Sequence, residues 1–180
     1  MLYTYGECKL KFGSDYQIKK AITDGKFYRK EKGVYSDEKY VAELEIISLK
    51  YPKAIFTLNS AFYYHGMTDV IPDYYYLQTI RGAAKIKDIR VKQIFENSSE
   101  VELGRIEMLY NGTRISIYNK ERMLIELIRS KNKLPFDYYK EIISSYRYKI
   151  DTLDIQEVQE YAYILPKTNM IMETLQLEVL

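Results

Sequence analysis

The stretch SDYQIKKAITDGKFYRKEKGVY, residues 14–35, decides how the N-terminal part of this 180-residue chain folds. Ser14 and Gln17 have the spacing of a capping box, which marks the start of a helix. A helix is therefore predicted from about Asp15 to Gly25, because glycine adopts the left-handed conformation that ends many helices. Three apolar residues recur at helical spacing and predict its buried stripe: Ile18, Ala21 and Ile22.

A basic hairpin is predicted directly after this helix. Residues 27–30 have the pattern of a strand, Lys32-Gly33 that of a tight turn, and Val34-Tyr35 that of the returning strand. This order is typical of the end of a winged helix-turn-helix, whose helix enters the major groove while the hairpin contacts phosphates. The residues predicted to contact double-stranded DNA are Tyr16, Gln17, Lys19, Lys20, Thr23, Arg29, Lys30 and Lys32. The alternative is an ordinary helix and hairpin that pack on the rest of the fold.

The charge of the chain is unevenly distributed. The whole chain has a net charge of +2, yet residues 9–32 alone hold eight basic and three acidic side chains. A basic N-terminal segment before a mildly acidic remainder is expected of a small DNA-binding head. A run of charge can also be no more than a solvated face.

The composition excludes several classes of protein. A single Cys rules out an intramolecular disulfide framework, and a single His rules out a multi-His metal centre. No apolar run approaches the roughly 18 residues that span a bilayer. Residues 1–11 carry charges where a signal peptide would be apolar, so no membrane association and a cytoplasmic location are expected.

No catalytic constellation is recognised, so we expect no enzyme activity, no metal and no cofactor. A Gly-rich phosphate loop followed by Lys-Ser or Lys-Thr is absent. Ser60, His65 and Asp69 resemble a catalytic triad in composition only, because Ser60 is not flanked by the glycines of a nucleophile elbow. His65 is interpreted as a hydrogen-bonded structural residue.

Tyrosine is unusually frequent, with 20 Tyr and no Trp in the chain. A tyrosine ring combines an apolar body with a polar tip, which suits interfaces and the stacking of bases. The alternative is compositional drift without a function.

Beyond residue 38 the pattern predicts a larger mixed domain. We expect a helix over 40–49 that Pro52 ends, a strand over 55–58, a helix from a cap at Asn59-Ser60 to His65, and a strand over 74–79. A loop over 81–92 is predicted to form a possible second phosphate-binding patch, whose members are Arg81, Lys85, Lys87, Arg90 and Lys92. A solvated loop is the alternative.

The C-terminal half begins with the clearest hairpin of the sequence. Strands over 102–110 and 113–118 flank Asn111-Gly112, which favours a type I′ turn. Asn119 should cap the next helix, whose apolar stripe includes Met123 and Leu127. Further helices are predicted over 137–148, over 155–165 and from about Asn169. The apolar C-terminal residues either complete the core or form a dimer contact.

Three segments in this order resemble the AbiEi-type antitoxins, the repressor half of type IV toxin–antitoxin systems linked to abortive phage infection. Residues 25–35 resemble the family's wing, residues 56–69 its threonine, serine-alanine and histidine-glycine block, and residues 115–129 its strand and glutamate-arginine helix. Ile71-Pro72 and the strand over 74–79 follow the block as in the family. The resemblance runs from about residue 13 to about residue 165. This chain departs from the family in having room for only one short helix before residue 14.

The resemblance implies an α+β protein of two domains. Residues 1–38 would form an abbreviated winged helix-turn-helix head, and residues 39–180 a mixed antitoxin domain ending in a helical cluster. The implied function is to bind inverted repeats in its own promoter and to counteract a nucleotidyltransferase toxin without a stable complex. The protein would be a monomer or weak dimer that binds DNA cooperatively. A plain winged-helix regulator without a toxin and a small metal-dependent nuclease are the alternatives.

Overall fold

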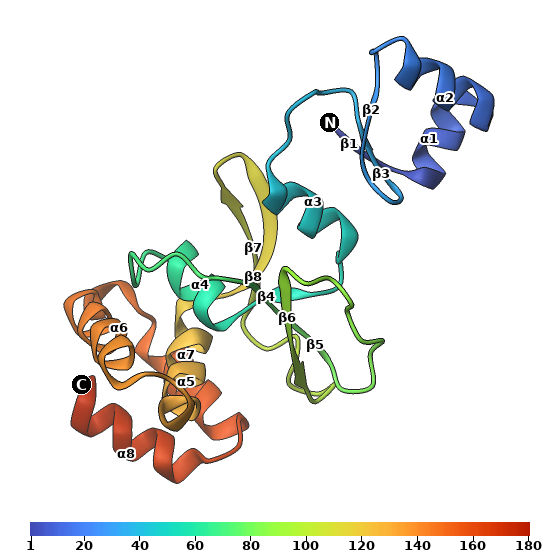
Figure 1. Cartoon of the computed structure of the whole chain (residues 1–180). Helices are drawn as coiled ribbons and strands as arrows, with labels where there is room; N and C mark the ends of the chain where they lie inside the picture. Colours follow the sequence, from blue (N-terminus) through green and yellow to red (C-terminus); the bar gives the residue numbers. More distant parts are fainter. The chain divides into compact units, whose positions relative to one another are not determined.

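The computed structural model describes residues 1–180 and has a mixed α+β fold of eight α-helices and two β-sheets (Figure 1). The chain divides into two compact units, one of residues 1–52 with 111–114 and one of residues 53–110 with 115–180. The sequence placed the boundary after residue 38. It lies later because the helix over residues 43–50 packs beside the N-terminal strand, with Lys50 Nζ 2.8 Å from Glu31 Oε2.

The first unit is a three-stranded antiparallel sheet with helices between its first two strands. Its elements are β1 (Leu2–Thr4), α1 (Tyr5–Phe12), α2 (Asp15–Thr23), β2 (Tyr28–Glu31), β3 (Val34–Ser36) and α3 (Glu43–Lys50). The strand order is β1-β3-β2, so the N-terminal strand lies beside the second strand of the hairpin. Strand β1 was not predicted. The helix predicted from residue 15, the short helix before it and the basic hairpin are confirmed.

Both ends of α2 follow from local sequence. The Ser14 side chain accepts a hydrogen bond from the Gln17 backbone N–H at 3.3 Å. At the other end Gly25 has a φ of +69°, and its N–H donates to Ile22 while that of Lys26 donates to Ala21. These two bonds form a Schellman motif, which turns the chain sharply from α2 into the hairpin.

A small aromatic core holds α1, α2 and the hairpin together. Cys8, Ile18, Phe27 and Tyr35 are buried at its centre, and Tyr3, Phe12, Ala21 and Ile22 pack around them. The Phe27 ring lies 4.9 Å from that of Phe12 and is stacked on that of Tyr35 at 6.1 Å. The predicted stripe of α2 is therefore confirmed as its inward face.

The second unit has a five-stranded sheet in the order β6-β5-β4-β8-β7. Its elements before the helical cluster are β4 (Ile55–Phe56), α4 (Leu58–Tyr64), β5 (Tyr75–Ile80), β6 (Val91–Glu96), β7 (Arg105–Tyr110) and β8 (Thr113–Tyr118). Strand β5 is parallel to β6 and antiparallel to β4, which is itself parallel to β8. The sheet is therefore mixed.

Two predictions in this unit are wrong. The loop predicted over 81–92 ends at residue 90, because Val91–Glu96 form β6 and pair in register with β5. Helix α4 begins at Leu58 with Thr57 at its N-cap position, so Asn59-Ser60 lie inside the helix instead of capping it. Ser60 is instead used within the fold, where its Oγ accepts from Tyr76 N and donates to Tyr74 O.

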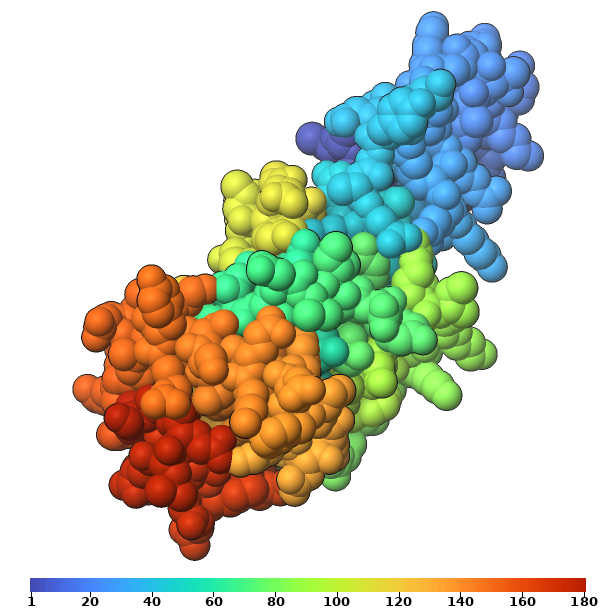
Figure 2. Space-filling model, turned by 60° about the vertical axis from the view of Figure 1, so that its left-hand side comes forward, coloured from blue at the N-terminus to red at the C-terminus, as the bar shows by residue number.

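Four helices gather at the C-terminal end of the second unit (Figures 1 and 2). They are α5 (Lys120–Arg129), α6 (Phe136–Tyr148), α7 (Ile155–Ile164) and α8 (Thr168–Glu178). Helix α5 is buried on nearly every side, and Asn119 caps it by accepting from Arg122 N at 2.9 Å. Ile171, Leu175 and Val179 are buried, so part of the apolar C-terminal segment completes this core. None of the helices has the length and apolar character required to cross a membrane.

Candidate nucleic-acid interface

The outward face of α2 carries all five side chains that the sequence predicted for it. Tyr16 is 71% exposed, and the remaining four, Gln17, Lys19, Lys20 and Thr23, are also exposed. Ile18 on the opposite side is buried in the core, which fixes the rotation of the helix. The outward face therefore presents a ring, an amide, a hydroxyl and two ammonium groups.

The acidic residue at the start of α2 is neutralised within the unit. Asp15 accepts a hydrogen bond from the Tyr5 hydroxyl at 2.6 Å and lies 3.1 Å from Lys9 Nζ. The hydrogen bonds from Tyr5 and Lys9 hold the pKa of Asp15 below its usual value. Because Lys9 is paired with Asp15, the positive charge of the outward face comes from Lys19 and Lys20.

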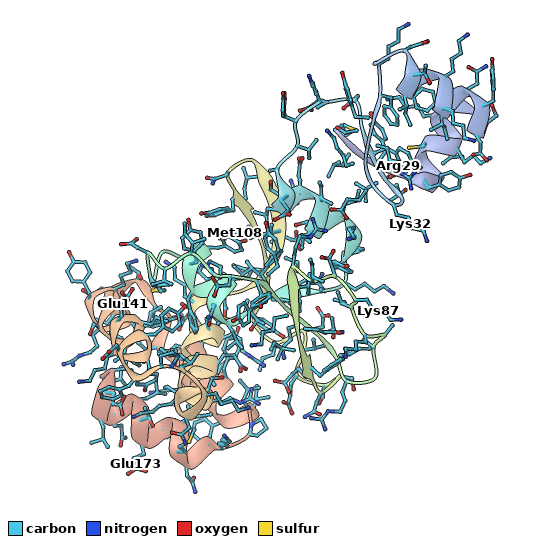
Figure 3. All side chains as sticks on the ribbon, in the orientation of Figure 1. Arg29, Lys32, Lys87, Met108, Glu141 and Glu173 are labelled. Atoms are coloured by element: carbon cyan, nitrogen blue, oxygen red, sulfur yellow. The ribbon has the colours of Figure 1, made fainter.

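The hairpin contributes fewer available cations than the sequence suggests. Arg29 and Lys32 are exposed on it, and Gly33 with a φ of +81° allows the tight turn beside Lys32 (Figure 3). Lys30 is partly buried, because its Nζ donates to the Lys39 carbonyl at 2.6 Å and lies 5.2 Å from the Tyr28 ring centroid. For Lys30 to contact DNA, its hydrogen bond to the Lys39 carbonyl would have to break.

One further basic residue belongs with this surface. Lys26 is exposed at the turn between α2 and β2, directly after Gly25. The sequence could have indicated this residue, because Lys26 follows the glycine that ends the helix. In a Schellman motif that residue leaves the helix toward the next element. The exposed cations of α2, of the turn after it and of the hairpin are then Lys19, Lys20, Lys26, Arg29 and Lys32.

The second predicted patch is also reduced by an internal ion pair. Asp88 accepts two hydrogen bonds from the Arg90 guanidinium, at 2.9 and 2.7 Å. The exposed residues on the loop are Arg81, Lys85 and Lys87, and Figure 3 shows Lys87 on its outer side. Lys92 lies on β6, with its Nζ 5.6 Å from the Tyr76 ring centroid.

Ser60 and His65 do not form a catalytic pair. His65 Nε2 lies 2.7 Å from the Tyr118 carbonyl, and because a carbonyl only accepts, that nitrogen carries the proton and donates. Burial lowers the pKa of His65, so the ring is neutral near pH 7. The hydroxyl of Ser60 is at the same time hydrogen-bonded to the backbone of Tyr74 and Tyr76.

The glutamate-arginine motif of the second unit lies in the core. Arg122 is completely buried, 3.2 Å from Glu96 and 2.9 Å from Glu126, and Arg129 contacts the same two carboxylates. The structure contains no group of three or more His, Cys, Asp or Glu side chains that could hold a metal ion. Arg122, Glu126 and Arg129 of α5 therefore form one ion-pair network with Glu96.

No protein-family model matches the chain, and no curated protein matches it either.

Proposed function

We propose that the chain is a double-stranded DNA-binding transcriptional autorepressor, with its first unit serving as an abbreviated winged helix-turn-helix. In this proposal α2 enters the major groove, and the β2–β3 hairpin contacts phosphates through Arg29 and Lys32. The observation that carries the proposal is the topology of the first unit. Helices α1 and α2 lie between β1 and a basic hairpin, and β1 pairs with the second hairpin strand.

The composition of α2's outward face supports direct reading of bases. Gln can bond an adenine edge with two hydrogen bonds, Lys can donate to guanine O6 or N7, and a threonine or tyrosine can contact a thymine methyl. Asp15, at the start of this face, is already bonded to Tyr5 and Lys9. Asp24, the exposed C-cap of α2, lies four residues after Lys20 and is the remaining carboxylate beside this face.

We further propose that the second unit is the antitoxin domain of a type IV toxin–antitoxin system. The support is the resemblance of residues 56–69 and 115–129 to AbiEi-type antitoxins, together with their distribution over the strands and helices of one unit. The partner would be a nucleotidyltransferase toxin, counteracted in the cytoplasm without a stable complex. A plain repressor without a toxin is the alternative.

The size of the head favours binding by more than one copy. The five exposed cations of α2, its following turn and the hairpin neutralise few phosphates, and non-specific affinity for such a footprint is typically about 10⁻⁴–10⁻⁶ M. Repressors usually reach about 10⁻⁸ M or tighter. Two heads on an inverted repeat close this gap, because the second head binds at a high effective concentration once the first is placed.

A titration of the chain's own promoter tests the DNA-binding half. The Q17A/K20A variant should lose about 1–3 kcal/mol per residue on the operator, with a much smaller loss on scrambled DNA. The matched control is Q176A/K140A, which removes the same side chains from exposed positions of the second unit. Equal operator affinity of Q17A/K20A and wild type would exclude α2 as the reading helix.

A growth assay with the adjacent toxin gene tests the antitoxin half with the full chain. If the second unit counteracts the toxin, Q17A/K20A rescues growth from a heterologous promoter although it no longer represses its own. Failure of both wild type and variant to rescue growth would identify a plain repressor.

A further inference from the structure

A second basic surface lies along two parallel strands of the second unit. We define the β5–β6 patch as Arg81, Lys85, Lys87 and Lys92, all of which are exposed. Because β5 and β6 are parallel, residues 81–90 must return along the whole length of the strands, about 17 Å for six residues. The cations are therefore spread along a line, and Asp88, the acidic residue of this segment, is bonded to Arg90.

Aromatic rings lie among these cations. Tyr74 is 45% exposed just before β5, and its ring is edge-on to that of Tyr76 at 6.5 Å. Tyr76 is paired in register with Lys92, whose ammonium lies 5.6 Å from the Tyr76 ring centroid. Phe95 on β6 is also exposed, but it pairs with Thr79 and lies on the opposite face of the sheet from Lys92 and Tyr76. Rings that can stack and ammonium groups that can bind phosphate thus share one pair of strands.

Two buried polar atoms beside Tyr76 lack a partner within the protein. The Asn59 amide donates to the Tyr76 hydroxyl at 3.5 Å, while its Oδ1 is buried and unpaired. The Tyr138 hydroxyl is also buried and unpaired, and its pKa is raised by burial and further by Glu141 and Tyr76.

We propose that the β5–β6 patch binds an unpaired nucleic-acid strand, with a base stacked on Tyr74 and phosphates held by Lys85, Lys87 and Lys92. The patch consists of a loop and a sheet edge, which offer no helix to enter a major groove, whereas exposed rings accept any unstacked base. The phosphate backbone and the unpaired base are common to RNA and DNA. The site is independent of α2, because it lies in the other unit.

Fluorescence anisotropy with labelled oligouridine and oligothymidine of about 12 nucleotides tests the proposal on the full chain. The K85A/K87A/K92A variant should bind both strands at least about tenfold more weakly, and its log Kd against log salt slope should fall by about two. The control K53A/K133A/K140A removes three other exposed lysines of the same unit and should stay within about twofold of wild type.

The aromatic part is tested by Tyr74→Ala, with Tyr148→Ala as its control because Tyr148 is 89% exposed on α6. Loss of the stacking ring should weaken binding about tenfold and leave the salt slope unchanged, since a ring neutralises no phosphate. Tighter binding of oligouridine identifies RNA as the source of the strand, and tighter binding of oligothymidine identifies DNA. Equal losses in the lysine variant and its control, or preferential binding of duplex DNA at the patch, would overturn the proposal.

Discussion

Replacement of Arg122 by methionine should destabilise the second unit more than any substitution at the candidate interface. Arg122 has no exposed surface, and it bonds Glu96, Glu126 and the carbonyl of Glu100. Its guanidinium also lies 4.9 Å from the Tyr118 ring centroid. Methionine retains much of the side-chain volume but supplies none of the hydrogen bonds, so the packing change is small and the electrostatic change is large.

The magnitude follows from the charges that remain. In the native network two guanidinium groups face two carboxylates, whereas in Arg122→Met only Arg129 faces Glu96 and Glu126. Removing one partner from a buried ionic network costs about 3–5 kcal/mol, because a charge is left buried without compensation. For a chain of this length the corresponding fall in Tm is about 6–20 °C.

A double-mutant cycle separates this effect from a loss of packing. Glu126→Gln in the Arg122→Met background restores one carboxylate to one guanidinium, so the double variant should be less destabilised than the sum of the single variants by about 0.5–3 kcal/mol. Urea unfolding followed by far-UV circular dichroism provides the free energies. Arg147→Met, at an exposed position of α6, is the control and should change stability by less than about 0.5 kcal/mol. A loss below about 1 kcal/mol in Arg122→Met, or strictly additive losses in the cycle, would refute the reasoning.

Three further predictions concern the hairpin, His65 and the operator. Lys32→Ala should weaken binding about equally on operator and scrambled DNA and reduce the salt slope by roughly one, as measured by titrations at several salt concentrations. Because burial lowers the folded-state pKa of His65, stability should fall as the pH drops below the unfolded value of 6.5, and His65→Gln should remove that loss in urea titrations at a series of pH values. Inserting about five base pairs between operator half-sites should abolish cooperative binding and about ten should partly restore it, whereas equal binding to one half-site and to the full repeat would exclude cooperation.

The parts of the fold that could be predicted from sequence are those with local causes. Ser14 and Gly25 define the ends of α2 because a cap and a Schellman turn need only neighbouring residues. Asn111 and Gly112 have φ values of +47° and +83°, as a type I′ turn requires, and Asn119 caps α5. In each case the residue type alone provides the unusual conformation or the missing hydrogen bond.

The parts that could not be predicted depend on distant partners. Strand β1 has three residues, and it forms because Tyr3 pairs with Tyr35. This pairing joins residues far apart in the sequence, so the local sequence pattern does not predict it. Val91–Glu96 contains a Lys and a Gln, and its first residues were therefore predicted to belong to a loop. The segment is a strand because it pairs in register with β5. The burial of Arg122 likewise depends on Glu96, which is far from it in sequence.

The same distinction applies to the candidate interface. Helical periodicity predicted the outward residues of α2, because the opposite stripe had to be buried. Counting basic residues overstated the available charge, since Lys9, Lys30 and Arg90 each have a partner that only the folded chain supplies. The number of basic residues in a sequence is therefore an upper limit on the number of cations that are free to contact a polyanion.

Helix α3 extends the first unit beyond the hairpin. The core of the head is formed by β1, α1, α2 and the hairpin, and α3 packs beside β1 with its own Ile46 and Ile47 buried. Lys50 of α3 bonds Glu31 of the hairpin at 2.8 Å, which joins this helix to the wing as well. A helix that follows the hairpin thus covers the strand that precedes it. The head that reads DNA in our proposal is therefore residues 1–52, and its hairpin is held from both ends, by the Gly25 turn and by α3.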